Sequence, residues 1–197
     1  MSYKEKLEEL IKEKKGIVLT KDVTMKGIPR EYIRQLVDKG TLKRIDRGVY
    51  IFKDCIDDKL YRLQSKYPSI IFSHFTSIGI HNSKSNKILN YEATVPSGYN
   101  SQNIEEYGVK VHHVKKELYE IGICTAKTEF GRDIKIYDIE RTICDILRNR
   151  NKIDITEINN ILKYYATRND KDIEKLKIYA KKFRISKVLE LYIPFLI

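Results

Sequence analysis

The sequence predicts an α+β protein with a small N-terminal domain and a larger mixed domain that ends in helices. Apolar residues recur at helical spacing in three short segments before residue 40. Residues 41–52 then alternate apolar and polar side chains around a glycine turn, as the two strands of a β-hairpin do. After residue 52 the segments with strand character are mixed with helical ones, and no long linker separates them. We therefore expect domains at 1–52 and 53–197.

The N-terminal helices follow from apolar spacing and from helix-end residues. Leucine and isoleucine on one face predict a first helix over residues 2–14. A short apolar link at 17–18 leads to a second helix over 20–26, for which Thr20 is a suitable N-cap. Pro29 suits the first turn of a third helix, because the N–H that proline lacks would have no partner there. A glycine follows each of the three helices, as at many helix ends.

The third helix is the most informative segment. With Ile33, Leu36 and Val37 facing inward, a rotation of about 100° per residue turns Arg34 and Gln35 outward. Three helices followed by a β-hairpin are the order of a winged helix-turn-helix domain. In such domains the N-terminal part of the second motif helix meets base edges in the major groove. Arginine and glutamine are the side chains that pair with guanine and adenine there.

Basic residues continue on the hairpin, where a wing would contact phosphates or the minor groove. The alternative is a solvated helix face beside a charged turn. The residues that we expect to contact DNA lie on the second and third helices, the hairpin and the C-terminal helices: Thr20, Lys21, Arg30, Tyr32, Arg34, Gln35, Lys43, Arg44, Arg47, Lys175, Lys181 and Lys182.

The charge distribution points to a polyanionic partner. The net charge is +11, and the sequence pI is about 9.4. Residues 1–52 carry 13 basic and 8 acidic side chains, residues 53–149 carry 14 and 13, and residues 150–197 carry 11 and 6. The excess of +5 at each end favours nucleic acid as the partner. The alternative is that the lysines serve solubility.

Composition narrows the class of protein. Hydrophobic residues make up 42% of the chain, which is enough for a packed core. No apolar run approaches the roughly 20 residues of a membrane helix, and the charged N-terminus does not resemble a secretory signal. Three widely spaced cysteines favour reduced thiols over a disulfide framework. We expect a cytoplasmic protein with no membrane partner.

The larger domain is expected to begin with a helix and to end with several. A helix over 57–67 precedes an apolar segment, 69–82, that has the character of a buried strand or helix. The remaining expectations are a loop at 82–87, strands at 87–95 and 109–114, a hairpin over 121–138 with Gly131 at its bend, and helices over 139–149, 155–166, 170–182 and 185–193, the first two of these helices capped by Asp138 and Asp154.

Three motifs occur in a characteristic order along the chain: LKRIDRGVY (42–50), SHFT (73–76) and ERTICD (140–145). Together with the helix that precedes the first motif, they resemble the AbiEi antitoxin family of bacterial abortive-infection systems. The resemblance covers most of the chain. No single motif is specific, but their order and separation are.

The resemblance implies two functions. The winged helix would bind inverted repeats of double-stranded DNA in the promoter of its own operon and repress it, and a dimer on the DNA is one option. The remainder would oppose a neighbouring nucleotidyltransferase toxin without a stable complex, as a type IV antitoxin in phage defence. The resemblance implies neither an enzyme nor a cofactor. The alternative is a winged-helix repressor whose C-terminal domain binds a small effector, and a nucleotidyltransferase gene next door would distinguish the two.

The sequence contains few of the residue patterns that catalytic or metal-binding sites require. His74 and His81 would share a helical face, but no Cys, Asp or Glu stands at ligand spacing, so no metal site is expected. His112 and His113 are neighbours on a strand and point to opposite faces. No serine or cysteine nucleophile motif appears, and Cys144 lies on the inward side of its helix as a small core residue.

One nuclease-like pattern is present. Asp133 and Lys135 form an Asp-x-Lys pair on an expected strand, and Glu117 or Glu120 would have to supply a second acidic ligand. With 33% charged residues, such a pair arises readily by chance, and both side chains fit the solvent face of an alternating strand. We therefore expect no nuclease activity.

Overall fold

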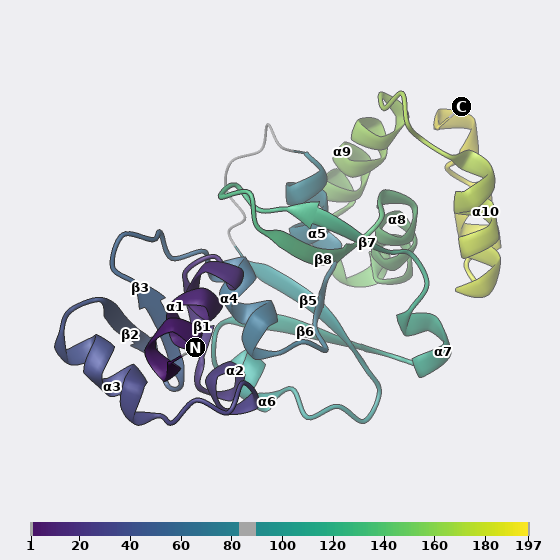
Figure 1. Cartoon of the computed structure of the whole chain (residues 1–197). Coiled ribbons are helices and arrows are strands. Elements are labelled where there is room, and N and C mark those ends of the chain that lie inside the picture. The colour runs from purple at the N-terminus through teal and green to yellow at the C-terminus, as the bar shows by residue number, and fades with distance from the viewer. Residues whose placement is uncertain (1, 83–89, 197) are drawn as a thin grey trace. The chain divides into compact units, whose positions relative to one another are not determined.

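The computed structural model describes residues 2–82 and 90–196, and it is an α+β structure as predicted (Figure 1). The chain forms two compact units. Unit 1 comprises Met1–Pro68 with Lys127–Ile134, and unit 2 comprises Ser69–Ala126 with Lys135–Ile197. The compact unit that contains 1–52 therefore extends further along the chain. A division of function at residue 52 stays a prediction.

Unit 1 has the predicted order of three helices and a hairpin, with one further strand and one further helix. Its elements are α1 (Tyr3–Glu13), β1 (Ile17–Leu19), α2 (Thr20–Met25), α3 (Glu31–Asp38), β2 (Leu42–Asp46), β3 (Val49–Phe52) and α4 (Lys59–Lys66). The strands form an antiparallel sheet in the order β1-β3-β2, so β2 lies at an edge.

The two faces of this sheet pack against different partners. One face, with Val18 and Leu42, joins the apolar stripes of α1, α2 and α3 in a single cluster. The opposite face carries Val49 and Ile51 and packs against Tyr61 of α4. Since each strand alternates its side chains between faces, both faces of so small a sheet become largely apolar.

Three local predictions for unit 1 need correction. The apolar link at 17–18 belongs to β1, which pairs with β3, because an extended segment beside an unpaired strand gains a ladder of hydrogen bonds. Thr20 is the first residue of α2 and does not cap it; Leu19 holds the N-cap position and donates its N–H to Asp22 Oδ2 at 3.2 Å. Helix α3 begins at Glu31, so Arg30 is its N-cap residue and Pro29 precedes the helix.

A buried ion pair joins the turn at 128–132 to the rest of unit 1. Arg132 Nη1 lies 3.4 Å from Asp58 Oδ2, and both side chains are buried. Arg132 also donates to the carbonyls of Ile56 at 3.2 Å and Lys15 at 3.1 Å. Asp58 caps α4 by accepting the N–H of Tyr61. One arginine therefore connects three separate segments of the chain.

Unit 2 combines a sheet with helices that lie mostly in its C-terminal half. Its described helices are α5 (His74–His81), α6 (Gln102–Glu105), α7 (Lys116–Tyr119), α8 (Ile139–Arg148), α9 (Ile155–Ala166), α10 (Ile173–Lys182) and α11 (Ser186–Glu190), with short 3-10 helices η1 (Arg150–Lys152) and η2 (Ile193–Phe195). The strands are β4 (Ile71–Phe72), β5 (Tyr91–Pro96), β6 (Val109–Val114), β7 (Ile123–Lys127) and β8 (Asp133–Tyr137); the end of β7 at Lys127 and the start of β8 at 133–134 belong to unit 1.

The five strands form one sheet in the order β6-β5-β4-β8-β7. Strand β5 pairs parallel with β6 and antiparallel with β4, and β4 pairs parallel with β8. The main apolar cluster of unit 2 lies among α8, α9, α10 and α11. Helix α8 is buried along nearly its whole length, which explains its run of isoleucine and leucine.

Most predictions for the larger part of the chain are confirmed. The segment 69–82 contains both a strand and a helix, the strand over 109–114 is found, and Asp138 caps α8 by accepting the N–H of Arg141 at 2.8 Å. The expected helix over 185–193 is shorter and gives way to η2. The predicted loop at 82–87 and the start of the strand at 87–95 lie mostly outside the described residues.

Candidate nucleic-acid interface

The exposed face of α3 carries the side chains that the sequence placed there. Ile33 and Leu36 are buried, whereas Arg34, Gln35 and Asp38 are exposed. Arg30 is exposed at the N-cap position and makes no side-chain cap bond. Arg34 Nε lies 3.9 Å from Asp38 Oδ2, in an exposed pair on one helix. Such a pair contributes little, so it leaves Arg34 available to another partner.

Helix α3 is held in place by the turn before it. Gly27 adopts φ +67°, a left-handed conformation that ends α2. Ile28 is buried in the cluster that α1, α2 and α3 share. Its N–H donates to the carbonyl of Val23 at 3.1 Å. This turn fixes the start of α3, and with it the position of Arg30.

The hairpin adds three exposed cations. Lys43 and Arg44 lie on β2, and Arg47 lies in the turn between β2 and β3. Gly48 has φ +72°, which favours glycine, and Asp46 Oδ1 accepts the N–H of Arg47 at 2.6 Å. Arg44 donates through Nε to the carbonyl of Asp46 at 3.3 Å, within the same strand. The turn is therefore ordered by its own polar groups while its charged ends remain exposed.

Three other predicted contact residues of unit 1 have intramolecular partners. Thr20 donates through its hydroxyl to the carbonyl of Gly48 at 3.4 Å, which links the start of α2 to the hairpin turn. Lys21 donates to the carbonyl of Ser65 at 2.8 Å, at the C-terminal end of α4. Tyr32 is half-buried, and its ring centroid lies 5.5 Å from that of Tyr3. These residues position the motif, and their contact with DNA stays a prediction.

The predicted C-terminal contacts differ among themselves. Lys181 and Lys182 are exposed at the end of α10. Lys175 Nζ instead lies 3.0 Å from Asp138 and 3.0 Å from Glu140. Partial burial opposes its charge, but hydrogen bonds to both carboxylates prevail and raise the pKa of Lys175. Lys175 therefore joins α10 to α8. Of the three predicted C-terminal lysines, Lys181 and Lys182 are the ones whose ammonium groups have no carboxylate partner among the described residues.

Unit 2 also contains a polar cluster that the sequence did not reveal. His74, Glu92 and His112 come from α5, β5 and β6, and their ligand-type atoms lie within 4.8 Å of one another. His112 Nε2 is 2.5 Å from Glu92 Oε2, and the His74 and His112 rings stack with centroids 3.6 Å apart. Spacing along the chain therefore did not predict a carboxylate near these histidines, because the sheet brings Glu92 beside both rings.

The geometry of this cluster does not suit a shared metal ion. The two imidazole planes are inclined by only 13°, so their in-plane lone pairs run in nearly parallel planes and do not converge. Both ring nitrogens of His74 are already engaged, by Ser73 Oγ at 3.0 Å and Asn149 Nδ2 at 2.8 Å. Burial, then the neighbouring His112, holds the pKa of His74 well below its usual value, so this ring is neutral near pH 7. We interpret the cluster as a structural connection between β5, β6 and the helices.

The polar residues of the ERTICD motif (140–145) are buried and paired. Arg141 Nε lies 3.0 Å from Asp145 Oδ2, and Nη1 donates to the carbonyls of Leu118 and Ile121. The guanidinium lies over the rings of Tyr137 and Phe183, at 4.0 and 4.2 Å. Nη2 of Arg141 is buried and has no hydrogen-bond partner among the described residues. The arginine fixes α8 against the segments around it, as a polar core residue.

The residues considered for enzyme chemistry are engaged in surface or core contacts. Asp133 pairs with Lys127 at 2.7 Å and Lys15 at 3.4 Å, and these hydrogen bonds lower the pKa of its carboxyl group. Cys144 is buried, and burial raises the pKa of its thiol. Burial also raises the pKa of Cys124, to about 11.

Within residues 2–82 and 90–196, no helix is both long and apolar enough to cross a membrane.

The three-helix order, the exposed arginines at the N-cap and on the outer face of α3, and the basic hairpin define a winged helix-turn-helix scaffold of the kind found in transcriptional regulators. Residues 5–53 match the family model described as a transcriptional regulator, AbiEi antitoxin. The match covers this scaffold and confirms the resemblance over that part of the chain. It indicates a transcriptional regulator of the antitoxin class, and this family is not one of enzymes. No curated protein matches the chain.

Proposed function

We propose that the protein binds double-stranded DNA through α3 and the β2–β3 hairpin and represses the operon that encodes it. The observation that carries the proposal is the combination, on one scaffold, of Arg30 at the N-cap of α3, Arg34 and Gln35 on its exposed side, and a basic hairpin. Residues 5–53, which hold all of these side chains, match the transcriptional-regulator family.

The two parts of the surface have different tasks in this proposal. The arginines and Gln35 of α3 read base edges in the major groove, since their fork-shaped groups form paired hydrogen bonds with guanine and adenine. Lys43, Arg44 and Arg47 neutralise phosphates and set the orientation of the domain on the duplex. Phosphate contacts supply affinity that depends on salt but carries little sequence information. A preference for inverted repeats follows if two copies bind adjacent half-sites.

The antitoxin part of the proposal concerns residues 53–197 and rests on the family resemblance. In this proposal the protein opposes a nucleotidyltransferase toxin from the same operon without a stable complex, as in type IV systems of phage defence. The buried motif residues Arg141 and Asp145 support the shape of this part of the chain. They have no catalytic task in the proposal.

A gel-shift titration with the DNA upstream of the gene tests the proposal. Full-length protein should bind the promoter at least about a hundredfold more tightly than a shuffled duplex of equal length at physiological salt, within the usual range of specific over non-specific affinity. Protection of an inverted repeat in a footprint and repression of a promoter fusion should accompany this. Equal affinity for promoter and shuffled DNA would refute sequence-specific regulation.

A further inference from the structure

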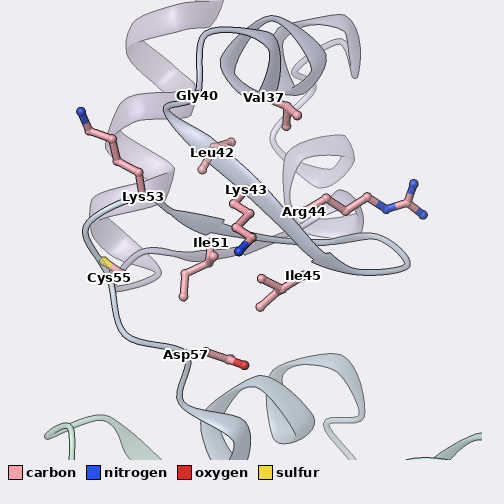
Figure 2. Close-up of a pocket in the computed structure, with 10 residues that line it drawn as sticks. All are labelled: Val37, Gly40, Leu42, Lys43, Arg44, Ile45, Ile51, Lys53, Cys55 and Asp57. Atoms are coloured by element: carbon pink, nitrogen blue, oxygen red, sulfur yellow. The ribbon is translucent and has the colours of Figure 1, made fainter.

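A groove of about 590 Å³ lies beside the hairpin of unit 1 (Figure 2). It borders the sheet face that carries Val49 and Ile51, where the half-buried Ile45 and the buried Ile51 form an apolar floor. Figure 2 shows these two side chains extending on the same side of the hairpin as Asp57. The lining consists of Val37, Gly40, Leu42, Lys43, Arg44, Ile45, Ile51, Lys53, Cys55 and Asp57.

The groove follows an open strand edge. Half of the lining residues come from the segment 40–45, which contains most of β2. Strand β2 is the last strand of its sheet, and it pairs with β3 alone. Lys53 donates its N–H to the carbonyl of Thr41 at 3.0 Å. The ladder is regular from Leu42 to Arg44 and shifts register between Arg44 and Asp46. By its alternation, the N–H and C=O groups of Leu42 and the N–H of Arg44 point away from β3, toward the edge.

The charges around the groove favour an acidic occupant. Lys43, Arg44 and Lys53 border it, and Asp57 is its only acidic lining residue. Asp57 Oδ1 lies 3.1 Å from Arg62 Nε, so a cation already balances it. Lys43 lines the same groove as Ile45 and Ile51. A second copy of this chain fits poorly, because its net charge is +11 and its own β2 edge carries Lys43 and Arg44.

From this geometry we propose that β2 accepts an extended segment of an acidic partner protein as a fourth strand. The segment pairs its backbone with Leu42 and Arg44, and its alternate side chains occupy the groove. Apolar side chains contact Ile45 and Ile51, and carboxylates meet Lys43. Since Lys43 and Arg44 also belong to the proposed DNA surface, the partner strand and DNA exclude each other. This exclusion rests on the proposed function, whereas strand binding does not.

The test uses the full-length protein, labelled with 15N, and a seven-residue peptide in which glutamate and valine alternate. The peptide should shift the amide signals of Leu42 and Arg44 more than those of residues on β1, and it should release bound promoter DNA. A peptide with lysine in place of glutamate should bind at least about tenfold more weakly. A peptide methylated at every backbone nitrogen should not bind, because it cannot form the ladder.

Ile45→Glu provides the matched variant, because it places a carboxylate on the floor of the groove at a half-buried position. It should weaken peptide binding about tenfold, whereas Ile155→Glu, the same change at an exposed site on α9, should leave it unchanged. The proposal is overturned if the acidic peptide does not bind, if the methylated or lysine peptide binds equally well, or if β2 signals broaden with protein concentration alone. Peptide binding without DNA release overturns the exclusion, and absence of promoter binding overturns the proposed function only.

Discussion

At the scale of single residues, the proposed DNA recognition depends on a difference between arginines that read bases and arginines that hold phosphates. Arg34 lies on the exposed face of α3, and Arg47 lies in the hairpin turn. Their charges are equal, so net charge cannot explain a difference between their variants. Position on the scaffold is the only distinction.

Arg34→Ala should weaken operator binding by about 1–3 kcal/mol and relax sequence preference, because it removes a paired contact to a base. Arg47→Ala should weaken operator and shuffled DNA about equally and reduce the salt slope by about 1. Titrations of both duplexes at several salt concentrations measure this difference. Identical behaviour of the two variants would contradict the assignment of α3 as the reading helix.

A second residue-scale prediction concerns pH. Since the folded pKa of His74 lies below its unfolded value of about 6.5, the unfolded chain binds a proton first as pH falls. The contribution of neutral His74 to the free energy of unfolding should therefore be complete above pH 6.5 and decrease as pH falls from there toward the folded pKa. The slope is up to about 1.4 kcal/mol per pH unit for one such group. The lowered pKa of His81 adds to the same trend.

Urea unfolding of the wild-type protein and of His74→Gln between pH 7.5 and 5.5 measures this effect. The variant should show a smaller loss of unfolding free energy over that range, whatever its stability at pH 7.5. An unchanged slope would mean that the pKa of His74 is the same in the folded and unfolded states.

At the scale of elements, the sequence was most informative where one chain segment determines its own structure. Helix α3 and the strand over 109–114 follow from apolar periodicity, and Asp138 marks the start of α8. Strand β1 was missed, because three apolar residues have no period and become a strand only when β3 pairs with them. The same reason hides the cluster of His74, Glu92 and His112, whose members come from three different elements. The predicted site residues of α3 and the hairpin share one scaffold, but sequence could not show which other lysines are engaged by carboxylates or carbonyls.

The ion pair of Arg132 and Asp58 leads to a prediction about the elements of unit 1. Arg132→Ala should lower the free energy of unfolding by about 3–5 kcal/mol, because it leaves a buried carboxylate without its cation. Urea unfolding gives the value. Lys127→Ala is the control, since it removes an exposed cation from the end of β7, just before that turn, and should change stability by less than about 1 kcal/mol. Similar effects of the two variants would mean that Asp58 gains another partner or is hydrated.

At the scale of the whole molecule, both ends of the chain carry an excess of +5. Exposed Lys181 and Lys182 are the candidates for a second basic surface at the C-terminal end. Lys181→Ala with Lys182→Ala should reduce affinity for promoter and shuffled DNA alike, and should reduce the salt slope by about 2 if both contact phosphates. An unchanged slope would show that these lysines face solvent and contact no phosphates. The winged helix would then bind DNA without help from the C-terminal helices.

We propose that one chain performs two separable functions, DNA repression and protection from the toxin, and a paired measurement distinguishes them. A triple variant, Arg30→Ala with Arg34→Ala and Arg47→Ala, is compared in cells with a control that loses three exposed lysines elsewhere, Lys12, Lys152 and Lys163. Promoter repression and growth rescue from the neighbouring toxin are measured together, at matched protein levels. The account predicts that the triple variant loses repression and still rescues growth, while the control retains both. A folded triple variant that fails to rescue would contradict it, because protection would then act through transcription alone.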